Sequence, residues 1–217
     1  MRLIADPTPI NDPDLLAFAG RTLSNLYTWF GHPCDPTWPV VIVYGGCEMC
    51  GRNRILREYS IVLRGAYPNE AMRLAALAHE LYHRATMIRR GLRSQLWIDE
   101  MLAFLTSQRI LELEGAGAYA EQRFQHLHQR YQPLDLHVVQ SVRTKRRWFG
   151  PIEYPIGFSA SVARLGVDLQ RIVGWRAACS LVAHSDFADW LASLPADRRA
   201  PAATTLGIPL QYVTIPP

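Results

Sequence analysis

The sequence is poor in lysine and cysteine and has no long apolar run. Lys145 is its only lysine, and four cysteines are too few for a disulfide-stapled scaffold of 217 residues. No stretch approaches the apolar length of a membrane-spanning helix, and no apolar signal-peptide segment follows Met1. Apolar residues make up 49% of the chain and charged residues 19%, which argues against extensive disorder. We therefore expect a soluble globular protein of the cytoplasm without a membrane anchor.

The excess of positive charge is small. The formal net charge is +4, and the densest basic run is Arg143, Lys145, Arg146 and Arg147, followed by Trp148. Such a run could contact the phosphates of a nucleic acid or an acidic partner. Short basic clusters are common on globular surfaces, so we interpret this one as a solvated loop face. The charge pattern thus gives little support to nucleic-acid binding, and the sequence leaves the oligomeric state open.

Two of the cysteines form a CxxC pair, Cys47 and Cys50, within a glycine-bounded segment at 45–51. A zinc ribbon needs a second such pair, which the sequence lacks. Cys34 could supply a third thiolate to a further metal site. A redox pair is conceivable, although no thioredoxin-like helix follows. We favour the simplest interpretation, a tight loop with reduced thiols.

Hydrophobic periodicity predicts an α+β chain in which a small strand-containing part precedes a mostly helical remainder. Helices are predicted over about 13–30, 69–90, 94–114, 119–131, 155–165, 175–183 and 187–193, and strands over 39–44 and 59–63. The segment 132–154 is less regular. The tail from Pro195 is rich in proline, and we expect it to be extended.

The motif with the clearest chemistry lies in the helix predicted at 69–90. His79, Glu80 and His83 form an HExxH sequence. Histidines four residues apart project from the same helix face, so their imidazoles can bind one zinc ion. Glu80 lies beside that face, where it can serve as the general base for a metal-bound water. The alternative is an ordinary amphipathic helix with two hydrogen-bonded histidines, but burying such polar groups without partners is costly.

A catalytic zinc ion commonly takes three protein ligands and keeps one position for water. The third ligand should come from a nearby element, and the next predicted helix, 94–114, contains Leu-Trp-Ile-Asp-Glu-Met from Leu96. Asp99 and Glu100 both qualify by their position early on this helix. Asp99 could instead orient a ligand histidine through its second ring nitrogen, or cap or solvate the helix.

At 71–105 the sequence resembles the gluzincin metallopeptidases, also called peptidase MA-like. These carry HExxH, a short connection and a second helix reading roughly W-hydrophobic-x-E-G-hydrophobic-A, which Trp97, Ile98, Glu100, Leu102 and Ala103 match. The resemblance implies that zinc is bound by His79, His83 and Glu100, with Glu80 as the base. It further implies a single zincin-like domain over 1–217. In that domain, a strand-containing lobe with the HExxH helix at 1–92 precedes a helical lobe at 93–194 and an extended tail at 195–217.

Two details of the resemblance concern the substrate cleft. The glycine usual after the ligand glutamate is Met101 here, and a larger side chain could narrow the cleft. The family holds peptides in extended form along a sheet edge, and by that analogy the edge would be the strand Tyr59 to Leu63.

Hydrolysis also needs a donor for the tetrahedral oxyanion. Tyr154, just before a predicted helix, resembles the tyrosine that opens the corresponding helix in some relatives. A tyrosine packed at a helix start with its hydroxyl in water is an equally good interpretation. The weaker candidates are His126, His128, Tyr131 and Arg143. His126 and His128 make a poor pair, because residues two apart point to different sides of a helix.

The sequence thus predicts a zinc-dependent metallopeptidase that acts on a peptide or protein substrate. Two alternatives remain open. The same zinc site could hydrolyse a non-peptide amide or a modified natural-product precursor, since the motif specifies water activation rather than the acyl group. The chain could instead be a nucleic-acid-binding module with a structural zinc, although such a site has no use for a base such as Glu80.

Overall fold

The computed structural model describes residues 8–31, 39–45, 49–53, 57–86, 95–142 and 154–212. The chain is mostly helical with one small sheet, which confirms the α+β class. It divides into two compact units. The first comprises Met1–Ile88 and Thr106–Ala120, and the second comprises Arg89–Leu105 and Glu121–Pro217. The first unit therefore contains a stretch of chain beyond the expected lobe at 1–92.

The sheet of the first unit has four strands in the order β1-β2-β4-β3. These are β1 (Thr8–Pro9), β2 (Val40–Gly45), β3 (Met49–Asn53) and β4 (Glu58–Arg64). β2 and β4 are parallel, whereas β1 and β3 run antiparallel to their neighbours. Both predicted strands, at 39–44 and 59–63, are confirmed. Along β4, Tyr59, Ile61 and Leu63 are buried and alternate with more exposed residues, as a half-buried strand requires.

Two predictions about this sheet were wrong. The segment 45–51 was expected to be a loop, but its end belongs to β3, which pairs with β4. Because β4 is paired on both sides, the strand from Tyr59 to Leu63 is not the sheet edge. Among the described strands, β1 and β3 take the two edges.

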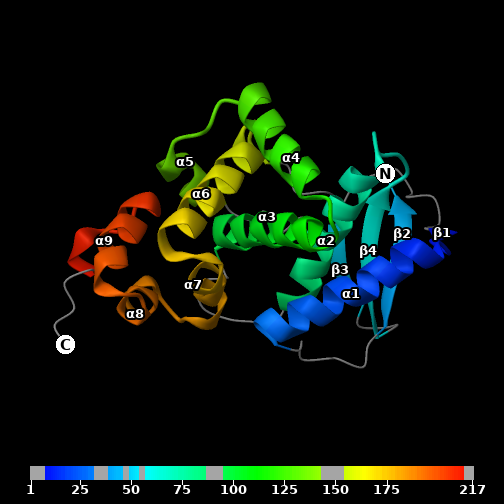
Figure 1. Ribbon diagram of the computed structural model, residues 1–217, viewed down its shortest axis with the longest axis horizontal. Helices are drawn as coiled ribbons and strands as arrows, with labels where there is room; N and C mark the ends of the chain where they lie inside the picture. The colour runs from blue at the N-terminus through cyan, green and yellow to red at the C-terminus, as the bar shows by residue number, and fades with distance from the viewer. Residues whose placement is uncertain are drawn as a thin grey trace. The chain divides into compact units, whose positions relative to one another are not determined.

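Two helices accompany the sheet, α1 (Pro13–Phe30) and α2 (Glu70–Thr86). Asp12 caps α1 by accepting from the backbone N–H groups of Asp14 and Leu15, and Gly31 ends it at a φ of 76°. α1 packs against α2, and α2 lies against β3 and β4 (Figure 1). α2 is therefore enclosed on two sides, which fixes the direction of its side chains.

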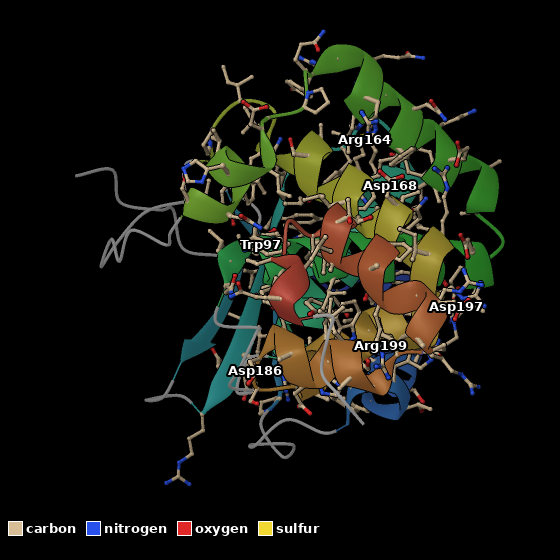
Figure 2. The ribbon with its side chains drawn as sticks, turned by 90° about the vertical axis from the view of Figure 1, so that its left-hand side faces the viewer. Trp97, Arg164, Asp168, Asp186, Asp197 and Arg199 are labelled. Carbon is tan, nitrogen blue, oxygen red and sulfur yellow. The ribbon has the colours of Figure 1, made fainter. Side chains whose placement is uncertain are left out.

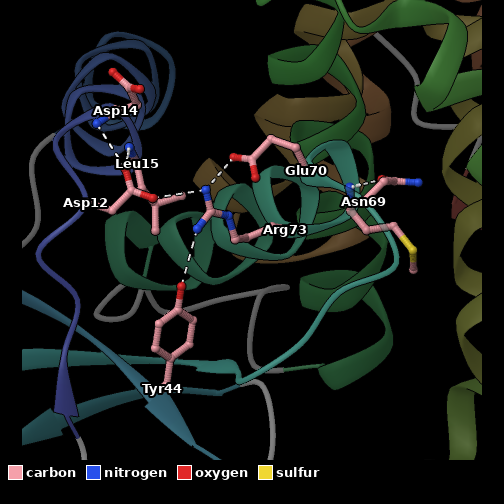
Figure 3. Close-up of polar contacts among 8 residues, drawn as sticks. Asp12, Asp14, Leu15, Tyr44, Asn69, Glu70 and Arg73 are labelled. Atoms are coloured by element: carbon pink, nitrogen blue, oxygen red, sulfur yellow. Dashed lines mark hydrogen bonds and ion pairs between the residues drawn. The ribbon is translucent and has the colours of Figure 1, made fainter.

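Arg73 connects the start of α2 to two other elements (Figure 3). Its Nη2 lies 2.8 Å from Glu70 and 3.0 Å from the Asp12 carboxylate, and its Nη1 donates to the Tyr44 hydroxyl at 3.3 Å. The carboxylate of Glu70, then the Tyr44 hydroxyl, raise the pKa of Arg73 above its ordinary value. One guanidinium thus joins the cap of α1, the end of β2 and the first turn of α2.

Helices α3 (Leu96–Leu113) and α4 (Gly117–Arg130) each contribute residues to both units. In the first unit, Leu111 of α3 and Ala120 of α4 form a small buried cluster with Ala75 of α2. Arg21 of α1 pairs with Glu114 through two hydrogen bonds, at 3.0 and 2.7 Å. The end of α3 is therefore anchored to α1 and α2.

The second unit is helical in its described part. It contains α5 (Leu136–Ser141), α6 (Phe158–Val173), α7 (Trp175–Ser180), α8 (Phe187–Ser193), α9 (Ala196–Thr205) and two short 3-10 helices, Leu181–Ala183 and Leu210–Tyr212. α6 contacts α5, α7 and α9. The sequence did not predict α5, and α6 starts and ends later than the helix expected at 155–165. Among the described residues, no helix is both long and apolar enough to cross a membrane.

The tail expected to be extended from Pro195 instead forms α9. The prolines of this segment suggested an extended tail, but Pro195 precedes the first helical residue, where proline is tolerated, and Pro201 lies inside the helix. Ala202, Ala203 and Leu206 give the segment a buried face. Arg199, labelled in Figure 2, donates to the carbonyl oxygens of Leu194 and Ala192 at 3.0 Å each and so holds α9 to the end of α8.

Candidate metal centre

The two motif histidines lie together on α2. The Nε2 atoms of His79 and His83 are 3.1 Å apart, and their ring centroids are separated by 4.8 Å. Two nitrogens bound to one tetrahedral zinc ion at about 2.0–2.1 Å lie roughly 3.3 Å from each other. The pair therefore has the separation that a shared metal ion requires. This geometry follows from helical spacing alone, since side chains at i and i+4 stack along one face.

Glu80 occupies the neighbouring helix face. It is only 7% exposed, whereas most glutamates of globular proteins are open to solvent. Leu77 and Leu81, close to it on the helix, are fully buried. The motif glutamate thus sits in a sheltered environment next to the histidine pair, as a general base for a water-excluding site should.

In the second unit, Glu100 lies in the first turns of α3. The Tyr154 hydroxyl donates to Oε1 of Glu100 at 2.7 Å, which is a short, charge-assisted hydrogen bond. The Tyr154 ring stacks on Phe158, with centroids 4.8 Å apart and planes 21° from parallel. The sequence indicates Tyr154 and Glu100 as site residues, but it does not predict the hydrogen bond between them. Phe158 was not predicted to belong to the site. In the sequence, only its spacing of four residues from Tyr154, at the start of a helix, could have indicated that the two rings stack.

His79, His83 and Glu100 form a group that could hold a metal ion, with the two histidines in the first unit and Glu100 in the second. Among the described residues, these are the same three that the motif and the resemblance predicted as ligands. Two imidazole nitrogens and one carboxylate oxygen form a donor set that suits zinc. The residues present therefore fit the metal that the sequence implies.

Met101, which follows Glu100, is fully buried. It packs against α6 at Gly166, where a Cβ atom would lie 3.2 Å from the Met101 Cγ and 2.8 Å from the Leu105 Cγ. Because glycine at this position makes room for it, Met101 fills the contact between α3 and α6. Its effect on the width of a substrate cleft stays a prediction.

The structure gives less support to the other site candidates, Asp99, His126 and His128. Asp99 is half-buried in the first turn of α3. His128 directs its Nδ1 at the Phe124 carbonyl oxygen of its own helix, 2.8 Å away, and His126 is exposed on the same helix, α4. No contact among the described residues joins either α4 histidine to Tyr154. They are therefore poor members of the site.

The remaining sequence features fall largely outside the described residues. These include Cys34, Cys47 and the whole basic run from Arg143 to Arg147. Cys50 belongs to β3, in place of the expected loop. Cys179 is a buried free cysteine, and burial raises the pKa of its thiol well above the ordinary value. Such a thiol is unreactive at neutral pH.

Comparison of the chain with protein-family models, with curated proteins and with solved structures found no match. The residues of the site are therefore the basis for a functional proposal.

Proposed function

We propose that this chain is a zincin-like, zinc-dependent metallopeptidase. The observation that supports the proposal most strongly is the pairing of the His79 and His83 imidazoles on one face of α2, beside the buried carboxylate of Glu80. Glu100 is the third ligand of the proposed site. A zinc ion held by these residues would lower the pKa of a water molecule and polarise the carbonyl of the bond to be cleaved. A purely structural zinc commonly takes four protein ligands, whereas three protein ligands leave one position open.

Glu80 acts as the general base. It accepts a proton from the attacking water and then returns it to the leaving nitrogen, which cannot depart as an anion. Its burial keeps competing water away and strengthens its electrostatic effect on the reacting atoms. Replacement by glutamine keeps the size and the hydrogen-bonding capacity of the side chain but removes the proton acceptor.

Tyr154 orients Glu100 in the resting site. Its hydroxyl donates to one oxygen of the carboxylate, and a hydrogen bond of this kind orients a metal ligand. The stacking on Phe158 limits the movement of the Tyr154 ring. To donate to the oxyanion of the reaction, which is one of the two roles that the sequence leaves open for Tyr154, the hydroxyl must exchange its bond to Glu100 for one to the substrate.

The extended substrate pairs with a sheet edge. β3 takes over the role that the resemblance assigned to the strand from Tyr59 to Leu63, because β3 is antiparallel to β4 and is an edge strand among the strands that the structure describes. Backbone hydrogen bonds along such an edge bind a peptide largely without regard to sequence. They also favour peptides over small non-peptide amides.

Metal content and peptide cleavage test the proposal together. We expect the purified chain to hold one zinc ion, and we expect both His79→Ala and Glu100→Ala to lose it. Glu80→Gln should retain zinc but lose cleavage of a mixed peptide library. His126→Ala, a change of an exposed histidine on α4, is the matched control and should affect neither readout.

Each unfavourable result has a separate meaning. Zinc retained in both His79→Ala and Glu100→Ala would refute the metal site. Zinc bound as expected without cleavage of any peptide would refute the peptidase activity and leave hydrolysis of a non-peptide amide as the alternative. Activity that survives Glu80→Gln would refute the assigned base.

A further inference from the structure

Ile156 is the most exposed of the large apolar side chains in the described part of the chain. It is 84% exposed, whereas the other exposed large hydrophobic residues there lie between 37% and 58%. It follows Tyr154 by two residues, and two residues of extended chain span at most about 7 Å. An apolar side chain that contributes almost nothing to the core therefore lies close to the tyrosine that contacts Glu100.

Ile156 is held at the tip of a rigid turn. The Phe158 N–H donates to the Pro155 carbonyl oxygen at 3.0 Å, and Gly157 has a φ of 89° and a ψ of −10°, as the third residue of a type II turn does. The stacked rings of Tyr154 and Phe158 close the base of the turn. The turn thus presents the Ile156 side chain to solvent.

Contacts to neighbouring segments immobilise the turn further. The buried Ser161 hydroxyl donates to the Gly157 carbonyl oxygen at 2.8 Å and accepts from the Leu134 N–H at 2.8 Å. A Cβ atom on Gly157 would lie 2.5 Å from the Gln132 carbonyl oxygen, so only glycine fits there. Turns usually carry small or polar residues, and a β-branched apolar residue at this tip gains no local stability from its position.

We propose that Ile156 contacts an apolar side chain of the peptide substrate, next to the bond that is cleaved. The inference rests on the peptidase function proposed above. A rigid apolar contact binds its partner at little cost in conformational entropy, because the turn is already ordered before the substrate arrives. The enzyme therefore prefers a large apolar residue beside the cleaved bond over a polar residue of the same size.

The test compares matched peptides that differ only in leucine or asparagine at one position flanking the cleaved bond. For the zinc-loaded full chain we expect a higher kcat/KM with leucine, and we expect Ile156→Thr to reduce this preference about tenfold. Leu210→Thr is the matched control, because Leu210 is 58% exposed in the same unit and should leave the preference unchanged. Both changes are at exposed positions and should leave the melting temperature unaltered.

Binding provides a second readout that does not depend on turnover. In the Glu80→Gln background, the ratio of the two peptide dissociation constants should also fall when Ile156→Thr is added. Cleavage with an unchanged preference in Ile156→Thr would overturn the role of Ile156 and leave the peptidase function intact. If the wild type cleaves none of the peptides, both proposals fail.

Discussion

Replacing Arg73 by methionine should loosen the attachment of α2, the helix that carries His79 and Glu80, to the rest of the first unit. The change removes two ion pairs and one hydrogen bond, all partly exposed, since the Arg73 side chain is 21% exposed. Partly exposed pairs contribute about 0.2–1 kcal/mol each. Removing Nε, which is buried without an acceptor, offsets part of the loss.

We therefore expect Arg73→Met to lower the free energy of unfolding by about 1–2 kcal/mol. For a chain of this length, each kcal/mol corresponds to a fall of roughly 2–4 °C in melting temperature. Urea unfolding followed by circular dichroism measures the loss. Zinc binding at saturating metal should persist, because Arg73 does not belong to the metal group.

The pH dependence of the free energy of unfolding shows how much of this loss comes from the Arg73–Asp12 ion pair. Its hydrogen bond from the Leu15 N–H, then the interaction with Arg73, hold the pKa of Asp12 below its ordinary value of 3.8. A carboxylate whose pKa is lowered by folding stabilises the native state above its unfolded pKa, and this contribution is lost as the pH falls through its folded pKa. The coupling free energy between Arg73→Met and Asp12→Asn, measured in a double-mutant cycle, should thus be present at neutral pH and disappear below pH 3.8.

Asp12→Asn suits this double-mutant cycle because asparagine preserves the cap of α1 and removes only the charge. Coupling that stays constant from neutral to acidic pH would show that the Arg73–Asp12 ion pair contributes nothing. A loss well above 3 kcal/mol for Arg73→Met would contradict the description of these contacts as partly exposed.

Three further changes test other contacts. Gly166→Ala should cost about 1–3 kcal/mol in urea unfolding, because its Cβ atom would lie 2.8 Å from the Leu105 Cγ, and an unchanged stability would refute the tight contact. Tyr154→Phe should weaken zinc affinity about 10–100-fold in a chelator competition without altering the melting temperature, and equal affinity would show that Glu100 needs no such partner. Arg84→Met should change stability by less than about 1 kcal/mol, since the buried Nε and Nη1 have no acceptor and only the contact with the Tyr59 ring, 3.6 Å away, is lost. A larger loss in unfolding measurements would show that Arg84 is better compensated than these contacts indicate.

The sequence predicted the elements that depend on local patterns. The HExxH spacing specified both the helix and the face on which His79 and His83 meet, because the period of a helix relates neighbours in the chain to neighbours in space. β2 and β4 were predictable from their β-branched runs for the same reason.

The sequence did not predict what depends on contacts between distant segments. β3 contains no β-branched residue, so its extended form depends on pairing with β4 rather than on local preference. The hydrogen bond from Tyr154 to Glu100 joins two segments far apart in the chain, and no periodicity encodes it. α9 escaped prediction because proline content outweighed its buried alanines.

The contact between Met101 and Gly166 has a consequence for related sequences. The space between helices α3 and α6 at this contact is limited, and a large side chain from either helix can fill it. A homologue with glycine at the position of Met101 should therefore carry a larger residue at the position of Gly166. Exchanging the two residues together should disturb the helices less than either change by itself.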